Sequence, residues 1–158
     1  MIAGNHVSNG RFYEGYECPE NTGAFIYANN HWSFINRDID KRISEVSGIL
    51  DACAFAQTML VYEGKVQQIP NTLPSKRYIR RALCDMHNNL IIVESKVKLT
   101  LEEFSDELVK SGVYSAIYLD MGAMNYSVWR EYSNDSIKTL HPFNNMTKYA
   151  TNYLRFQL

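Results

Sequence analysis

Chemistry in this sequence is first suggested by a carboxylate that follows an apolar run. Asp120 comes directly after residues 115–119, which read Ser-Ala-Ile-Tyr-Leu, and Gly122 follows it closely. A carboxylate at the carboxyl end of a buried strand, followed by glycine, is where α/β proteins tend to place chemistry. Asp120 could act there as a general acid or base, or it could cap its own loop by accepting hydrogen bonds from loop N–H groups. The sequence leaves both roles open.

Three further side chains could bind an anion, exchange a proton or hold a ligand. Arg81 could pair with a phosphate or carboxylate through its guanidinium fork, or lie as a solvated arginine at a strand edge. His141, just before Pro142, could serve as a general acid, although a lone histidine in a loop is more often a surface or capping group. Asn9 could position a ligand or close its own Asx turn.

Other chemistries have little support in the sequence. The cysteines are widely spaced and form no C-x-x-C pair, which favours free buried thiols over a zinc framework or a disulfide scaffold; they are Cys18, Cys53 and Cys84. His, Asp and Glu do not cluster at ligand spacing, so we predict no metal site and no cofactor, and we leave a divalent metal ion open. Ser127 lacks a G-x-S-x-G context, so acyl transfer is not indicated.

The elements that must position Asp120 begin with a helix after Thr100. Thr100 and Glu103 have the spacing of a capping box, in which each side chain accepts a hydrogen bond from the backbone of the other. Gly112 supplies the left-handed residue that ends many helices. Apolar residues recur between them at helical spacing: Leu101, Phe104, Leu108 and Val109. We therefore predict a helix from about 101 to 111, followed by a buried strand at 115–119.

Three pairs of β-prone runs are joined by short turns and predict hairpins at residues 24–35, 58–69 and 80–94. In the last pair, the arm from Leu90 to Glu94 is almost continuously apolar, which predicts a central strand covered on both faces. Residues 36–51 carry a weak helical pattern, so a helix and an irregular excursion both stay open. A terminal strand is expected near 151–156.

These elements predict an α+β fold with a mixed, mainly antiparallel sheet, several hairpins and one principal helix packed on the sheet. The chain has 158 residues, enough for one core that buries roughly 70% of the unfolded surface. We therefore expect a single domain over 1–158, and we leave an N-terminal truncation open. The oligomeric state is not indicated.

Composition excludes several classes of protein. The 46% hydrophobic and 21% charged residues are ordinary globular values and argue against disorder. A formal net charge of −1 argues against a nucleic-acid partner, because no net basic field would attract phosphates. The apolar runs are far shorter than the roughly 20 residues of a membrane span, and the N-terminus has no apolar signal-peptide core.

Five short motifs follow one another in an order that resembles a known family. They are Asn9-Gly10-Arg11-Phe12-Tyr13, Leu60-Val61-Tyr62-Glu63-Gly64-Lys65, Arg81-Ala82-Leu83, Thr100-Leu101-Glu102-Glu103-Phe104 and Tyr118-Leu119-Asp120. The first of them precedes a hairpin strand that begins Gly23-Ala24-Phe25-Ile26. In this order the chain resembles the phosphodiester glycosidase family, which includes the lysosomal enzyme that removes N-acetylglucosamine from a sugar phosphodiester. The resemblance covers nearly the whole chain.

The chain departs from the family where the family has a glycine-rich turn. After its strand the family reads Asp-Gly-Gly-Gly-Ser, whereas residues 120–127 read Asp-Met-Gly-Ala-Met-Asn-Tyr-Ser here. Glycines let backbone N–H groups approach a phosphate closely, so bulkier residues should narrow or reshape that cradle. Gly122 is kept, and Asn125 and Ser127 could still supply polar contacts. The second glycine of the early motif is replaced by Arg11.

The resemblance implies a hydrolase that acts on a sugar-phosphate or related glycosidic substrate and that is exported. It implies Asp120 as the acid or base and Arg81 as the anion contact. Because catalysis needs both groups within reach of one substrate position, we predict that they face a common cleft. Further substrate-binding candidates are Asn9, Gly10, Gly122, Asn125, Ser127 and His141. The alternative is a non-catalytic glycan- or phosphosugar-binding domain that has lost the glycine-rich loop and uses aromatic side chains as a platform.

Overall fold

The computed structural model describes residues 4–16, 18, 22–69, 76–119, 127–131, 136–143 and 145. The chain falls into two units, one of residues 2–120 and one of residues 121–158 together with Met1.

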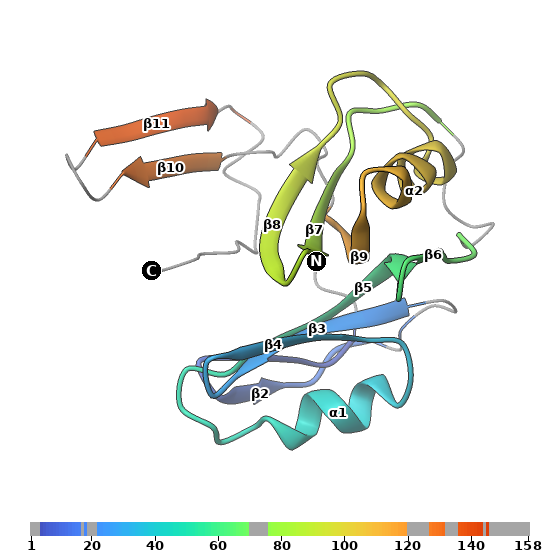
Figure 1. The fold of residues 1–158 in the computed structure, drawn as a ribbon. Helices are drawn as coiled ribbons and strands as arrows, with labels where there is room; N and C mark the ends of the chain where they lie inside the picture. The colour runs from blue at the N-terminus through green and yellow to red at the C-terminus, as the bar shows by residue number, and fades with distance from the viewer. Residues whose placement is uncertain are drawn as a thin grey trace. The chain divides into compact units, whose positions relative to one another are not determined.

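The first unit is an antiparallel sheet with two helices (Figure 1). Its strands are β1 (His6–Ser8), β2 (Arg11–Tyr13), β3 (Thr22–Ala28), β4 (His31–Ile35), β5 (Cys53–Tyr62), β6 (Lys65–Val66), β7 (Arg81–Met86), β8 (Asn89–Glu94) and β9 (Val113–Leu119). The helices are α1 (Ile39–Glu45) and α2 (Leu101–Lys110). The order in the sheet is β2-β1-β5-β9-β7-β8, while β3 pairs with β4 and β5, and β6 pairs with β5. Every pairing among the described strands is antiparallel, as predicted for most of the sheet.

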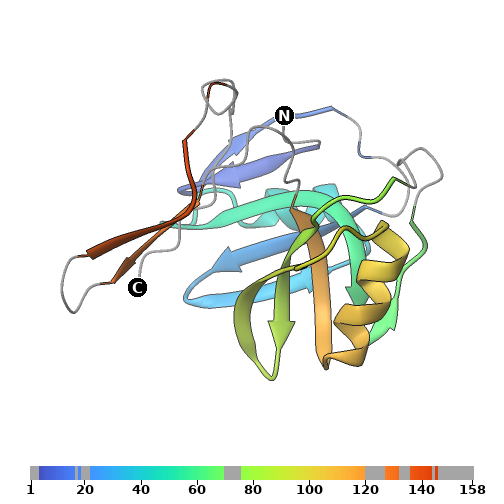
Figure 2. The same cartoon turned by 90° about the horizontal axis from the view of Figure 1, so that it is seen from above.

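The long strand β5 joins two halves of this unit. Its first part pairs with β1 and β3, and its last part pairs with β9 and β6. Phe25 and Phe34 from one half share a hydrophobic cluster with Leu83 and Ile117 from the other, so one core lies between the two halves. Each half has a second cluster beneath its own helix, α1 or α2. Figure 2 shows β5 passing through both halves.

The predicted helix after Thr100 is confirmed, but it is one of two. Thr100 accepts a hydrogen bond from the Glu103 N–H at 3.2 Å, and Glu103 accepts one from the Thr100 N–H at 3.0 Å. The other helix, α1, lies in the segment that the sequence left open. It begins after Asp38, which makes no side-chain cap, and it buries Ile43. Because the helix is short and uncapped, tertiary packing is what stabilises it, which explains its weak signal in the sequence.

The three predicted hairpins are present, and a fourth joins β1 to β2. Each is closed by two residues with positive φ, the geometry that favours Asn and Gly in two-residue turns. The turn residues are Asn9–Gly10, Asn29–Asn30, Glu63–Gly64 and His87–Asn88. The sequence therefore encodes these turns locally.

The prediction that residues 90–94 form a central strand covered on both faces is wrong. The strand β8 is an edge strand that pairs only with β7 among the described strands, and its Ile92 is 49% exposed. The helix α2 contacts β5, β6 and β9 instead, which leaves the outer face of β8 without a covering helix among the described elements. The buried central strand is β9, whose Ala116 and Ile117 are fully buried.

The second unit contains a two-stranded antiparallel sheet of β10 (Ser127–Glu131) and β11 (Ser136–His141). The terminal strand expected near 151–156 lies outside the described residues.

Candidate functional site

Arg81 lies at the first rung of β7, opposite the last residue of β9. The Cα partner of Arg81 on β9 is Leu119, and its partner on β8 is Glu94. Asp120 is the next residue after Leu119, so the backbone register brings Arg81 to the strand end that the sequence analysis selected. Asp120 itself lies outside the described residues, as do Gly122 and Asn125, and the expected common cleft stays a prediction.

The guanidinium of Arg81 is held by a carboxylate on the neighbouring strand. Its Nε and Nη2 both donate to Oε2 of Glu94, at 3.1 and 2.6 Å. The Arg81 side chain is only 13% exposed and that of Glu94 is 34% exposed. Any anion that binds Arg81 from the solvent therefore meets a cation whose charge is already largely neutralised.

Sequence analysis missed Glu94 as a partner, although a signal for it was present. The turn at His87–Asn88 sets the register of the hairpin, and this register puts Arg81 opposite Glu94. Opposite charges on directly opposed strand residues attract one another. Locating the turn to the residue would therefore have predicted the pair.

Arg80, the residue before β7, is buried and is held by neutral groups. Its residue exposure is 4%. The side chain donates from Nε to the Leu99 carbonyl at 3.0 Å, from Nη1 to the Tyr118 hydroxyl at 3.1 Å, and from Nη2 to the Lys76 carbonyl at 2.5 Å. Its guanidinium carbon lies 5.1 Å from the ring centre of Tyr78 and 5.7 Å from that of Tyr118. None of the ion pairs among the described residues includes Arg80.

The backbone around Arg80 is tied to the segment that precedes α2. Tyr78 and Leu99 exchange two backbone hydrogen bonds, of 3.0 and 2.8 Å. The Arg80 carbonyl accepts from the Ser95 N–H at 2.8 Å, and the Arg80 N–H donates to the Ser95 hydroxyl at 2.8 Å. These bonds fix where the Arg80 side chain begins.

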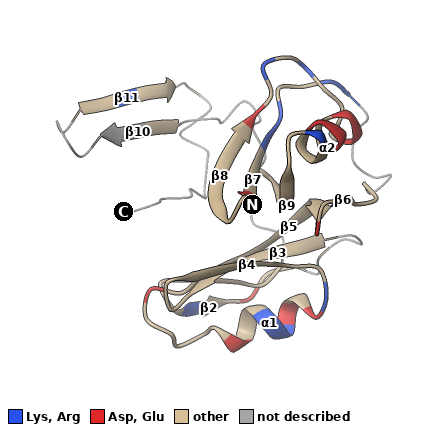
Figure 3. Ribbon diagram, viewed as in Figure 1, with Lys and Arg blue, Asp and Glu red and all other residues tan. Residues whose placement is uncertain are grey.

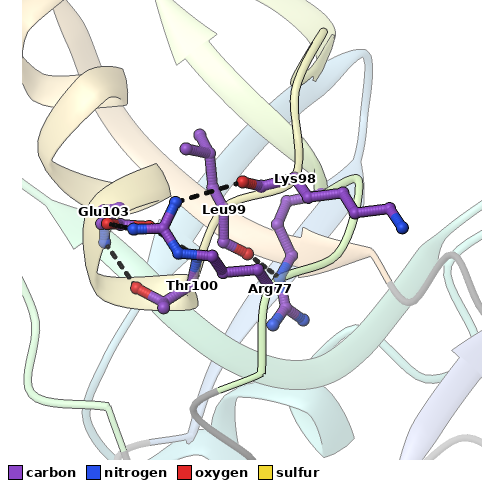
Figure 4. Close-up of polar contacts among 6 residues, drawn as sticks. Arg77, Lys98, Leu99, Thr100 and Glu103 are labelled. Carbon is purple, nitrogen blue, oxygen red and sulfur yellow. Dashed lines mark hydrogen bonds and ion pairs between the residues drawn. The ribbon is translucent and has the colours of Figure 1, made fainter.

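A second tie joins the same segment to the start of α2. Arg77 forms an ion pair with Glu103, the residue that caps Thr100, and its Nη1 donates to the Lys98 carbonyl at 3.5 Å (Figure 4). Glu103 therefore serves the helix cap and the arginine together. Figure 3 shows that α2 is rich in acidic residues, and that the segments entering β7 and α2 carry basic ones.

A groove of about 620 Å³ lies between α2 and the end of β8. Its apolar lining includes Val93, Leu99 and Phe104, and acidic and basic side chains also line it. The groove includes Glu94 but not Arg81. It therefore lies beside the ion pair and does not contain the predicted anion contact.

Asn9 and Gly10 form the turn between β1 and β2, away from Arg81. The Gly10 N–H donates to the Ala52 carbonyl at 2.8 Å, just before β5 begins. The strand β9 runs antiparallel to β5, with Ile117 opposite Met59, so Leu119 and its partner Arg81 lie at about the level of Gln57. Ala52 is roughly 16 Å of extended strand from that level, at about 3.3 Å per residue, and the strand β9 separates Arg81 from β5. The structure does not bring these two candidates together with Arg81.

Gly10 has a structural reason to be glycine. Its φ is +74°, and an added Cβ would lie 2.3 Å from the Ile49 carbonyl oxygen. Asn9 also has positive φ, at 49°, which asparagine tolerates. The turn geometry accounts for both residues without a ligand.

Ser127 and His141 belong to the second unit, where they are Cα partners across β10 and β11. The Ser127 hydroxyl is shielded from solvent and has no hydrogen-bond partner among the described residues. The structure therefore brings these two candidates together within their own unit.

The cysteines are free thiols, as predicted, but only Cys84 is buried, whereas Cys18 and Cys53 are partly exposed. Burial raises the pKa of Cys84 to about 12, and a hydrogen bond from the Val93 backbone lowers it only in part. Burial also raises the pKa of Cys18, and the nearby charge of Asp40 adds to this effect. A raised pKa disfavours the thiolate, so neither cysteine has the setting of a nucleophile.

No three His, Cys, Asp or Glu side chains gather around a possible metal position in the part of the chain that the structure describes. Neither described helix has the length and apolar character needed to cross a lipid bilayer. Comparison with known proteins adds no relative, since no family model and no curated protein matches this chain.

Proposed function

We propose that the protein is a hydrolase of the phosphodiester glycosidase type, acting on a sugar-phosphate or related glycosidic substrate. The observation that carries the proposal is the pairing of Arg81 with Leu119, the residue before Asp120. Arg81 begins β7 opposite the last residue of β9, and Asp120 follows that residue in the sequence. An anion contact and an acid or base are the two groups that hydrolysis of a charged glycosidic bond requires.

In this proposal the roles divide between Asp120 and Arg81. Asp120 transfers a proton to the leaving oxygen or takes one from the attacking water, and Arg81 contacts the negative charge of the substrate. Glu94 holds the guanidinium of Arg81 in one orientation before substrate arrives. Orientation in advance reduces the cost of ordering the side chain on binding.

The test is hydrolysis of an aryl phosphodiester and of a sugar-1-phosphodiester over a broad pH range. Wild-type protein should release product, and Asp120→Asn should lower the rate by roughly a hundredfold or more, as expected for loss of a general acid or base. Asp51→Asn is the matched control, because Asp51 is exposed and has φ of +60°, which asparagine accepts. Equal rates for wild type and Asp120→Asn, or no hydrolysis of either substrate, would overturn the proposal.

A second candidate is a non-catalytic domain that binds a glycan or phosphosugar. It is favoured by the Glu94 contact, because hydrolysis needs the charge of Arg81 and Glu94 already neutralises it, whereas binding needs only an aromatic platform with a few polar contacts. Substitutions Met121→Gly and Ala123→Gly together separate the two candidates. Hydrolysis gained by the double variant identifies a lapsed enzyme, whereas folded protein that binds phosphosugar without hydrolysis supports the binding domain.

The resemblance also leads us to propose that the protein is exported. Fractionation of cells that express the gene under its own promoter would test this, with recovery outside the cytoplasm as the expected result. Recovery only with cytoplasmic markers would contradict it.

A further inference from the structure

The two adjacent arginines at the start of β7 differ in how their charges are compensated. Arg81 shares two hydrogen bonds with the Glu94 carboxylate. Arg80 is more deeply buried, at 4% exposure, yet its described acceptors are two carbonyls and one hydroxyl. Removing a cation from water is costly unless an opposite charge compensates it. The tyrosine rings that flank Arg80 offset part of this cost.

The guanidinium of Arg80 also has N–H groups that donate to no described acceptor. A guanidinium has five N–H groups, and three of those of Arg80 donate to described acceptors, one from each nitrogen. The two remaining N–H groups lie on Nη1 and Nη2. One N–H group on each terminal nitrogen is what a guanidinium uses when it binds the two oxygens of an oxyanion in a fork.

The guanidinium of Arg80 contacts a side chain near the end of β9. Nη1 contacts the hydroxyl of Tyr118, which is two residues before Asp120. The bonds from Tyr78, Leu99 and Ser95 hold the Arg80 backbone in place, so the side chain is oriented before any anion arrives. An oriented, poorly hydrated cation interacts with an anion more strongly than a surface arginine does.

We propose that Arg80 binds an oxyanion, a phosphate or carboxylate group, at the carboxyl end of β9. This inference rests on the proposed function and deepens it, because it assigns the larger part of anion recognition to Arg80 instead of Arg81. The charge of Arg80, which no described carboxylate pairs, attracts the anion, whereas the Arg81–Glu94 pair lies on the opposite face of the sheet at the same end of β7. Tyr118 accepts one hydrogen bond from Arg80 and so keeps the fork in place.

The test is binding of inorganic phosphate and of acetate to the full chain, each compared with chloride at matched ionic strength. Titration is followed by thermal unfolding and by NMR of backbone and arginine side-chain N–H groups. Wild type should be stabilised by one of the oxyanions, and the Nε–H signal of Arg80 should move with saturation. A response to phosphate alone identifies a phosphate site, and a response to acetate alone identifies a carboxylate site.

Variants then assign the anion to one arginine. Arg80→Lys keeps the charge but loses the fork, and it should weaken binding by about tenfold or more, the loss expected for a charge-assisted hydrogen bond. Arg81→Lys should weaken it by less than about threefold, because Glu94 already neutralises that side chain. Arg77→Lys is the control for a surface arginine on the same segment.

The proposal fails if neither oxyanion differs from chloride, or if Arg80→Lys binds as wild type does. If Arg80→Lys does not fold, the wild-type Nε–H titration decides, and an Arg80 signal that stays unmoved at saturation overturns the proposal. These measurements need no turnover. Anion binding without hydrolysis therefore rejects the proposed enzyme and keeps the Arg80 site. Hydrolysis by a protein whose anion affinity is unchanged in Arg80→Lys keeps the enzyme and rejects the Arg80 site.

Discussion

The two halves of the first unit share strand β5 but hold their helices by different means. In the half that contains the arginines, α2 has a complete capping box, a left-handed Gly112 after its end and an ion pair to Arg77. In the other half, α1 has no side-chain cap at Asp38 and relies on the burial of Ile43. One half is therefore fixed by local polar contacts at its helix start in addition to packing, whereas α1 is held by packing and by one hydrogen bond from Asn5 to Asp40 at 3.0 Å.

This difference matters for the candidate site. A binding site is most precise where rigid elements hold its side chains in one orientation. The contacts that cap α2 also hold the residues leading into β7, because Glu103 pairs with both Thr100 and Arg77. The segment that leads into β7 is therefore held by side-chain contacts that the start of α1 lacks.

The largest effects should come from removing the buried side chain under each helix. Leu108 is 2% exposed and Ile43 is fully buried, so Leu108→Ala and Ile43→Ala should each lower the free energy of unfolding by about 2–5 kcal/mol. Urea unfolding measures the loss. Ile43→Ala should in addition speed amide exchange in residues 39–45 while the sheet stays protected, because α1 has no cap to retain it.

Small losses of unfolding free energy, or equal changes of amide exchange in both helices, would contradict this difference between the halves. A loss under about 0.5 kcal/mol for Leu108→Ala would put that side chain at the surface instead of in the core. Equal exchange of α1 and α2 in both variants would mean that the caps do not distinguish the helices.

The same difference explains what the sequence could predict. The capping box at Thr100 and the paired turn residues such as Asn29–Asn30 are local signals, and the structure confirms the helix and the hairpins. The helix α1 has no such signal, and its packing against β1, β3 and β5 depends on distant parts of the chain. The apolar composition of β8 likewise led to a wrong prediction, that of a central strand covered on both faces. An apolar run does not reveal which side of a sheet a helix will cover.

The candidate site was predictable only in part, for a similar reason. The motif order selected Arg81, and the register of the sheet puts it beside the residue before Asp120. Its neutralisation by Glu94 depends on hairpin register, and the burial of Arg80 depends on contacts with Leu99 and Tyr118 in other segments. A run of basic residues in a sequence shows that positive charge is present, but not which residue is buried or compensated.

A smaller effect is expected from the helix caps themselves. Thr100→Ala removes the hydroxyl that accepts from Glu103, and it should cost about 1 kcal/mol of unfolding free energy. Asp38→Gly is the matched variant in the other half, because glycine accepts the φ of +51° at this position, and it should cost less than about 0.5 kcal/mol since Asp38 makes no cap hydrogen bond. Urea unfolding of both variants gives the comparison directly. Equal losses would show that the two helices are held in the same way.

The smallest stability effect, and the sharpest test of the arginine pair, is expected from Glu94→Gln. The Arg81–Glu94 pair is partly exposed, and pairs across strands contribute about 0.2–1 kcal/mol, so the unfolding free energy should fall by less than about 1 kcal/mol.

The Glu94→Gln variant removes the charge that competes with a substrate anion for Arg81. If Arg81 contacts the anion, phosphate affinity should rise by about two- to fivefold in a calorimetric titration, because less neutralisation opposes binding. If Arg80 alone recognises the anion, the rise should match that of Glu107→Gln, which removes the same charge from an exposed pair with Lys110 and so reports only the change in net charge. A Glu94→Gln effect beyond that control therefore gives Arg81 a direct share of the anion, and an effect equal to it leaves recognition to the buried arginine.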